Sequence, residues 1–246
     1  MLTALFDGSI DGFLSVIYSC YYDKRNYEYV FEDSVYQQQL DVEYIYVPTE
    51  ERHSVKVIDA VGKRISPEAQ SRLYKCCLSN DENRFTELLH YIRLGFKVGA
   101  SVDNHLQNPH VLMVHKLAGY VSHEAHLLTG FCRFKETKSG VYYAAISPVS
   151  NALPIVAEHF RDRLMNQPWV IHDTSRGLAA IYDCNDCIIE PAPANANVDC
   201  SKDEALFQEL WRTFFDTIAI KERVNKKLQR NFIPLHFRKH ITEFLK

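Results

Sequence analysis

The sequence predicts an α+β protein with a mainly antiparallel sheet, a central helical subdomain and helices towards its carboxyl end. Three observations lead to this prediction. Short segments with alternating or continuous apolar residues occur near the start and again in the second half, and apolar residues at helical spacing fill the middle. In addition, 46% of the 246 residues are hydrophobic, which is enough for a substantial core.

The chain is expected to open with a strand at Leu2–Phe6, a turn at Asp7-Gly8-Ser9 and a capped helix. Residues 28–48 are rich in Tyr and Val, and 42–47 alternate as a half-buried strand does. We expect this region to pair with the first strand.

Helical spacing dominates from about residue 60 to 130. One helix is expected to follow Ser66, because proline occupies its first helical position. A second is expected after Asn80, and a third from about Pro109 to Thr129, with apolar residues at core spacing.

A β-hairpin is predicted where Phe131–Lys135 and Val141–Ile146 flank the turn residues 137–140. A helix at Leu153–Leu164 is expected next. Three further strands are predicted after it, at Trp169–His172, Leu178–Tyr182 and Cys187–Glu190. Because short turns join these three, they must be antiparallel neighbours.

The predicted organisation is one α+β core over residues 1–190, a linker at 191–203 and a basic helical segment at 204–246 packed on the core. Prolines in the linker oppose helix formation, and its small residues bury little. Two helices are expected in the last segment, at Glu204–Ile218 and about Glu222–Gln229.

No apolar run approaches the roughly 20 residues that cross a bilayer, and the start lacks the basic region of a signal peptide. We therefore expect a cytoplasmic protein without membrane contact. The seven cysteines are an odd number, and Cys76 and Cys77 are adjacent, so reduced thiols are expected.

Two pairs of residues have the spacing of metal ligands. Cys184 and Cys187 form a C-x-x-C motif without a second ligand pair, and we interpret it as a hairpin turn. His123 and His126 share one helix face, where they are structural histidines, part of a polar ligand site or metal ligands. No third ligand is evident, so neither a metal nor a cofactor is predicted.

Catalytic chemistry has few candidates. His126, His172 and Asp173 are the residues to consider, with His172 either an exposed acid-base group or the polar side of a half-solvated sheet. The sequence has no phosphate-binding loop, dinucleotide fingerprint, iron-sulfur cysteine cluster or serine nucleophile elbow.

Charge is distributed unevenly. Residues 1–60 carry eleven acidic and four basic side chains, whereas residues 221–246 carry eight basic and two acidic ones, which can mark a polyanion-binding end. On the last predicted helix, cations share one face, while Val224, Leu228 and Phe232 are expected to face the core. The candidate phosphate-contacting residues are Arg133, Lys135, Arg161, Arg163, Arg176, Arg223, Lys226, Lys227 and Arg230.

Five segments together resemble a bacterial family of unknown function labelled a probable DNA-metabolism or DNA-repair protein. They are Phe6-Asp7-Gly8-Ser9, Glu124-Ala125-His126, residues 167–173, residues 211–215 and residues 225–230. The resemblance implies a radical-SAM protein as partner. Some members also carry a uracil-DNA-glycosylase-like domain, which these 246 residues lack, and neither glycosylase nor radical-SAM activity carries over to this chain.

Three hypotheses follow from the residues and the resemblance. The first is a DNA-associated accessory protein whose basic surfaces contact phosphates while a partner performs the chemistry. The second is a hydrolase or lyase acting on damaged DNA through His126 and His172, with or without a metal. The third is a protein-binding scaffold that makes no contact with nucleic acid.

Overall fold

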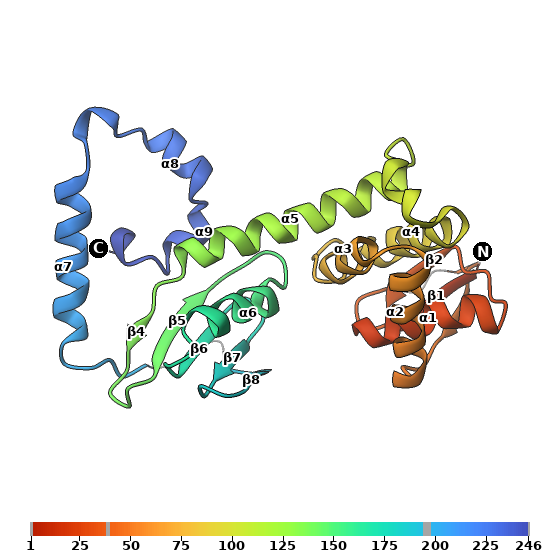
Figure 1. Ribbon diagram of the computed structural model, residues 1–246, viewed down its shortest axis with the longest axis horizontal. Helices are drawn as coiled ribbons and strands as arrows, with labels where there is room; N and C mark the ends of the chain where they lie inside the picture. Colours follow the sequence, from red (N-terminus) through yellow and green to blue (C-terminus); the bar gives the residue numbers. More distant parts are fainter. Residues whose placement is uncertain (1, 38–39, 194–197, 246) are drawn as a thin grey trace. The chain divides into compact units, whose positions relative to one another are not determined.

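The computed structural model describes residues 2–37, 40–193 and 198–245. The chain divides into two compact units, residues 1–122 and 123–246, and the boundary lies within helix α5 (Pro109–Phe131) (Figure 1). The predicted core of residues 1–190 therefore spans parts of two units. None of the described helices combines the length and the apolar character needed to span a membrane.

The first unit contains a three-stranded parallel sheet in which β1 (Leu2–Phe6) lies between β2 (Tyr29–Glu32) and β3 (Glu43–Tyr46). Helix α1 (Ile10–Tyr22) follows β1, and Ser9 caps it by accepting a hydrogen bond from the backbone N–H of Gly12 at 2.9 Å. The predicted pairing of residues 28–48 with the first strand is confirmed, and two strands of that region take part in it.

Asp7 organises the turn between β1 and α1. Its carboxylate accepts hydrogen bonds from the hydroxyls of Ser9 and Thr49, each at 2.7 Å. Although its slight burial would raise the pKa of Asp7, these hydrogen bonds hold that pKa below its usual value. A β-carbon added to Gly12 would lie 2.3 Å from Asp7 Oδ1, so the turn closes directly onto the helix.

Among the described residues, four further helices complete the first unit, together with the start of α5. They are α2 (Glu51–Arg64), α3 (Pro67–Cys77), α4 (Arg84–Val98) and a 3-10 helix (Gly99–Asn104). The sequence patterns predicted α3, α4 and α5 but not α2. In the core, the rings of Phe6, Phe13 and Phe85 lie 4.8 to 6.3 Å apart and join the sheet to α1 and α4.

The second unit is built on a five-stranded sheet of order β4-β5-β6-β7-β8 with helix α6 (Leu153–Arg163) packed against it. Its strands are β4 (Lys135–Glu136), β5 (Tyr142–Ile146), β6 (Trp169–Asp173), β7 (Leu178–Tyr182) and β8 (Cys187–Pro191). The core includes Trp169 and Ile171 of β6, Ile146 of β5 and Phe160 of α6.

The prediction of an α+β fold is confirmed, but the sheets are less antiparallel than expected. The β4-β5 hairpin and the β6-β7-β8 meander are antiparallel, as predicted. In contrast, β5 and β6 are parallel because α6 forms the crossover between them, and the first sheet is parallel throughout its described strands. Phe131, predicted to begin a strand, instead ends α5.

The end of the chain contains α7 (Glu204–Ile218), α8 (Lys226–Phe232) and α9 (Leu235–Arg238), with a 3-10 turn before α8 and another after α9. Part of the predicted linker is ordered beside β4, since Ser201 N–H donates to Glu136 O at 2.9 Å and Lys138 N–H to Asp199 O at 2.9 Å. Linker residues 194–197 lie outside the described part of the chain.

Candidate nucleic-acid interface

The two pairs with the spacing of metal ligands lie in different parts of the second unit. His123 and His126 are both exposed on α5, and Cys184 and Cys187 lie at the β7-β8 turn, where Asp183 accepts the backbone N–H of Asn185 and that of Asp186. Over the described residues, no group of three or more His, Cys, Asp or Glu side chains is placed to hold a metal ion.

His172 is a core residue rather than an exposed acid-base group. Its side chain lies on the sheet face opposite α6 with 1% exposure, and its Nδ1 is hydrogen-bonded to the Tyr143 hydroxyl at 2.8 Å. Burial lowers the pKa of His172, so its neutral form is favoured. Both sequence interpretations of this residue, which assumed contact with solvent, are corrected by its burial.

Asp173 and Arg176 are joined to each other. The Asp173 carboxylate is completely buried and accepts hydrogen bonds from the Ser175 backbone and from Arg176 Nη1 at 3.1 Å. The guanidinium of Arg176 also donates to the carbonyl oxygens of Pro148 and Val149. Arg176 therefore fastens the loop after β5 instead of presenting its charge to solvent.

Glu124 holds the same loop from the other side. Its two carboxylate oxygens accept the backbone N–H groups of Val149 and Ser150, each at 2.7 Å. The helix α5 that presents Glu124 thus fixes the position of the loop that follows β5. This is a structural use of the His123-Glu124-Ala125-His126 segment.

A Ser–His pair that the sequence did not reveal lies at the carboxyl ends of β5 and β6. Ser147 Oγ is 2.6 Å from His240 Nε2 and 2.8 Å from Thr174 Oγ1. Burial lowers the pKa of His240 to about 4, and the charges of Lys239 and Lys135 act in the same direction. Ser147 is itself buried and no described carboxylate hydrogen-bonds to His240, so a catalytic triad is not formed.

Arg133, from the segment before β4, is engaged in a structural ion pair. Its guanidinium makes two hydrogen bonds to Glu243 and lies 5.6 Å from the centre of the Trp211 ring. Lys135, two residues further along the chain, is half-buried. Arg161 and Arg163 are exposed on α6, and Arg161 forms an ion pair with Asp162. These four cations therefore differ in how freely they can reach a phosphate.

The C-terminal basic segment, Arg223 to Phe232, is the most accessible set of predicted cations. Arg223, Lys226, Lys227 and Arg230 are exposed, and within the described chain none of them forms an ion pair. Asn225 begins α8 by accepting the backbone N–H groups of Lys227 and Leu228 at 3.1 Å.

The apolar side of this segment is exposed as well, contrary to the sequence prediction. Val224, Leu228 and Phe232 were expected to face the core, but 68% of Phe232 is accessible and the other two are also more than half exposed. Helical spacing predicts which residues share a face. It does not determine whether another element covers that face. Within the described residues, the C-terminal basic segment thus combines cations that form no ion pair with an exposed aromatic ring.

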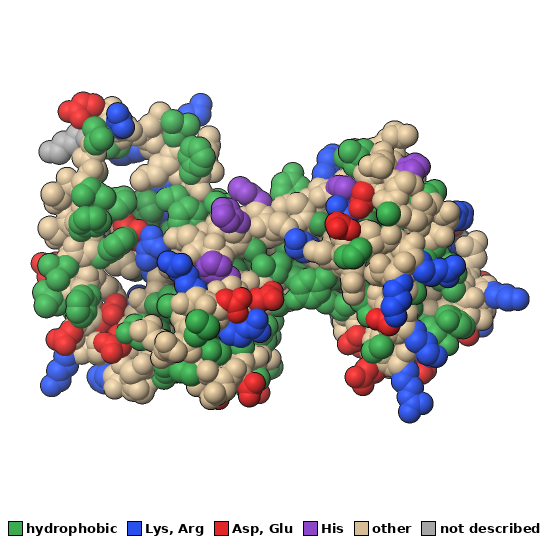
Figure 2. Space-filling view, viewed as in Figure 1, with side chains coloured by type: hydrophobic (Ala, Val, Ile, Leu, Met, Phe, Trp, Pro, Cys, Tyr) green, Lys and Arg blue, Asp and Glu red, His purple; other side chains and the backbone are tan. Residues whose placement is uncertain are grey.

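Helix α7 carries a second exposed apolar surface. Figure 2 shows hydrophobic side chains gathered over this helix. Its exposed large apolar residues are Leu206, Phe207, Leu210, Trp211, Phe214 and Ile218. Next to this stripe, α7 packs on the end of the chain, where Phe215 lies 6.4 Å from Phe244. An apolar stripe of this length is typical of a surface that binds another molecule.

In the first unit, an aromatic cleft of about 340 Å³ lies between α1, α2 and α4. Tyr18 stacks on Tyr22 with ring centres 4.1 Å apart, and Lys56 lies 5.6 Å above Tyr18. On the other side, Arg64 lies 5.8 Å from the Phe96 ring. Stacked rings beside cations are suited to nucleobases and phosphates.

The sequence interpretation missed this aromatic cleft because it did not predict α2, which carries Lys56 and Arg64. The helical spacing of Ser54, Val57 and Val61, all buried, was the available signal. Without that helix, nothing in the sequence places Lys56 and Arg64 beside Tyr18 and Tyr22.

Comparison with known proteins gives a family but no activity. A model of a domain of unknown function, DUF4130, matches residues 82–243, which is well over half of the chain. A search of curated proteins found no match. The expected relationship to a family of unknown function is therefore confirmed: this chain belongs to the DUF4130 family.

Proposed function

We propose that this protein is a cytoplasmic accessory factor of DNA metabolism or repair that binds single-stranded DNA and works with a radical-SAM partner. The observation that carries the proposal is the C-terminal basic segment, where four exposed cations that form no ion pair with any described residue accompany an exposed Phe232. Cations provide the sequence-independent contacts to phosphates, and exposed rings provide stacking platforms for unpaired bases.

The aromatic cleft of the first unit supports the same proposal independently. Its rings and its cations Lys56 and Arg64 offer stacking and phosphate contacts of the same kind. A duplex presents its bases already stacked, so a surface that uses rings in this way favours single strands.

The buried state of His172 and the structural use of Asp173 argue for an accessory role over hydrolysis or lyase chemistry. Neither side chain reaches solvent, and no acid-base side chain among the described residues hydrogen-bonds to the imidazole of His126. In this proposal the partner performs the reaction.

A protein scaffold is the second candidate, and the exposed apolar face of α7 favours it. DNA binding does not account for six exposed large apolar side chains on one helix. Phosphates contact cations, and bases need only a few aromatic rings for stacking. Helices with such a face commonly lie in a groove of a partner protein. The family resemblance implies that the protein bound by α7 is the radical-SAM partner.

Salt-dependent DNA binding tests the proposal. Fluorescence anisotropy with a labelled single strand of roughly 20 nucleotides, longer than one binding module contacts, would be measured over a series of salt concentrations. The triple variant Lys226→Gln/Lys227→Gln/Arg230→Gln removes three contacts, so the slope of log K against log salt should fall by about 2.

The matched control is Arg52→Gln/Lys97→Gln/Lys116→Gln, which removes three exposed charges elsewhere. It should leave the slope nearly unchanged. Absence of DNA binding by the unmodified protein even at low salt would overturn the proposal, as would an equal loss in both triple variants.

A further inference from the structure

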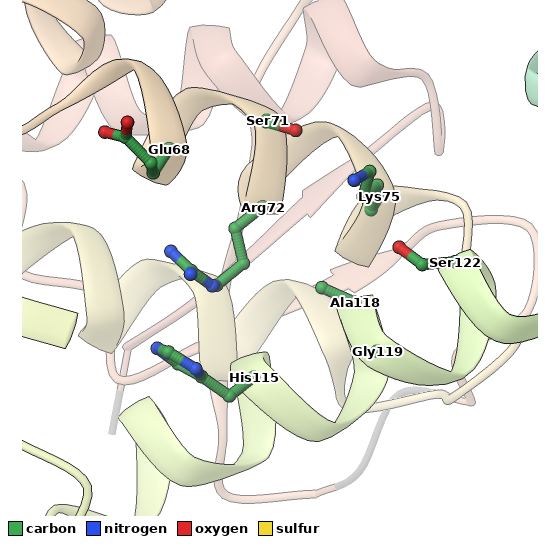
Figure 3. A pocket seen from close by; sticks show the side chains of 8 residues that line it. All are labelled: Glu68, Ser71, Arg72, Lys75, His115, Ala118, Gly119 and Ser122. Carbon is green, nitrogen blue, oxygen red and sulfur yellow. The ribbon is translucent and has the colours of Figure 1, made fainter.

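A cavity of about 370 Å³ lies in the first unit between α3 and α5 (Figure 3). Its volume falls within the range of small-molecule sites, roughly 300–1,000 Å³. Helix α3 and helix α5 each supply four lining residues, which are Glu68, Ser71, Arg72 and Lys75 from α3 and His115, Ala118, Gly119 and Ser122 from α5.

One end of the cavity is held in place by a carboxylate behind it. Asp103 accepts hydrogen bonds from Arg72 Nη1 at 2.7 Å, from the Tyr91 hydroxyl at 2.8 Å and from His115 Nε2 at 3.0 Å. Burial would raise the pKa of Asp103, but these hydrogen bonds and the charge of Arg72 together lower it. Asp103 thus stays ionised and orients both cavity-lining side chains.

Hydrogen-bond donors remain available to a ligand after this network is formed. The Arg72 guanidinium uses Nη1 for Asp103, and in the described structure its Nε and Nη2 have no acceptor. His115 likewise retains its second ring nitrogen. The two side chains face the same gap (Figure 3).

Lys75 and Ser122 lie at the other end of the cavity. Lys75 is half-buried, and no described carboxylate pairs with its ammonium group. The hydroxyl of Ser122 points towards the end of α3 that carries Lys75 (Figure 3). Glu68, the one acidic side chain in the lining, lies at the opposite end of α3 from Lys75 (Figure 3), so it does not neutralise that group.

Gly119 keeps the space between the two ends open. It lies within α5, where glycine is unfavourable, and a β-carbon added there would meet no atom within 4 Å. Packing against a neighbour therefore does not require glycine at this position. A larger side chain would extend into the cavity that Gly119 lines.

We propose that this cavity binds the phosphate group of a small phosphorylated molecule of the nucleoside-monophosphate class. A phosphate monoester carries more than one negative charge and three acceptor oxygens, which suit a wall of guanidinium, ammonium and hydroxyl donors. The cavity has room for more than the anion alone. This site lies in the first unit and its ligand is a small molecule, so the proposal is independent of DNA binding by the C-terminal basic segment.

Isothermal titration calorimetry of the full chain tests this binding with three probes: inorganic phosphate, a nucleoside 5′-monophosphate and the same nucleoside without phosphate. The monophosphate should bind saturably and more tightly than the other two. Lys75→Met should weaken monophosphate binding about tenfold, the effect of one charge-assisted hydrogen bond, whereas Lys116→Met, an exposed lysine on α5, should not.

Filling the cavity gives the second measurement. Gly119→Leu should abolish monophosphate binding, and Gly130→Leu, at the other α5 glycine whose added β-carbon meets no atom within 4 Å, should leave it unchanged. A 5′-phosphorylated oligonucleotide compared with its unphosphorylated form distinguishes a DNA end from a free nucleotide as the source of the phosphate. The proposal is overturned if no phosphate-bearing probe binds saturably or if Gly119→Leu and Lys75→Met both bind like the unmodified protein.

Discussion

Arg133 and Glu243 form an ion pair with two hydrogen bonds, at 2.6 Å between Nη2 and Oε1 and 3.2 Å between Nε and Oε2. The pair joins the segment after α5 to the last residues described. Only 5% of the Glu243 side chain is exposed, so the guanidinium supplies the charge that its burial requires. The Trp211 ring beside Arg133 connects α7 to this ion pair.

Glu243→Ala should lower the free energy of unfolding by about 2–3 kcal/mol, because it leaves a largely buried arginine without its partner. Urea denaturation measures this effect, and Glu209→Ala, at an exposed site on α7, is the control. Burial alone would raise the pKa of Glu243. The hydrogen bonds and charge of Arg133 contribute to a larger opposite effect, so the net shift of that pKa is downward. The stability that Glu243 contributes is therefore fully present above the pKa that it has in the unfolded chain. It is lost as the pH falls through the pKa that Glu243 has in the folded protein. Equal losses in the two variants would contradict a buried ion pair.

His240 should make the second unit sensitive to mild acid. Since its folded pKa, about 4, lies below its unfolded value of 6.5, the unfolded chain binds more protons between these two values. Stability from this group is complete above pH 6.5 and decreases as pH falls towards 4. After allowance for its partial exposure, the loss from pH 7.5 to pH 5 should be about 1 kcal/mol.

The measurement for His240 is urea denaturation at both pH values in the unmodified protein and in His240→Gln, which cannot titrate. The glutamine amide can still accept a hydrogen bond from Ser147. The difference between pH 7.5 and pH 5 should be smaller in the variant. An identical pH dependence would show that other groups account for the acid sensitivity.

Gly12→Ala should destabilise the first unit although alanine favours helix. The added carbon would lie 2.3 Å from Asp7 Oδ1 and 2.8 Å from Thr49 Oγ1, and this crowding should cost about 1–3 kcal/mol. Gly130→Ala, where the added carbon meets nothing within 4 Å, should instead gain up to about 1 kcal/mol. Thermal melts of the two variants should therefore shift in opposite directions, and a shift in the same direction would disprove the close approach at Gly12.

Tyr22→Ala should weaken binding to single-stranded DNA by about 1–3 kcal/mol, the range for loss of one stacking platform. Its ring stacks on Tyr18 in the aromatic cleft and is 64% exposed. Tyr120→Ala is a suitable control because that ring is similarly exposed, at 69%, on α5. Anisotropy titrations with a single strand and with a duplex should show the loss mainly for the single strand. Equal affinities in the two variants would remove the aromatic cleft from the proposed interface.

Elements with strong periodicity and clear boundaries were predictable from the sequence. The three strands from Trp169 onwards are short, largely apolar segments separated by turn residues, and their antiparallel order follows from the short connections. Helix α2 was missed because it lacks a side-chain cap at Glu50 and exposes Val55, so neither its start nor its apolar face is clear.

The candidate site was less predictable, because tertiary contacts decide which side chains remain free. Arg176 and Arg133 look like phosphate ligands in the sequence, yet Asp173 and Glu243 engage them in the fold. Residues that pair over a distance of 110 positions leave no local pattern. In the C-terminal basic segment, helical spacing correctly groups Lys226, Lys227 and Arg230 on α8. The predicted helix at about Glu222–Gln229 begins too early, because Arg223 lies in a 3-10 helix before α8.

The two hydrogen bonds that Glu124 accepts from Val149 and Ser150 have a consequence for the position of α5 along its own axis. If the helix advanced by one residue, Ala125 would replace Glu124 and both backbone N–H groups would lose their acceptor. Each unpaired group would cost about 1–3 kcal/mol if it stayed buried. Glu124 therefore fixes the position of α5 along its axis, because only one register of the helix places a carboxylate at the two backbone N–H groups of the loop after β5.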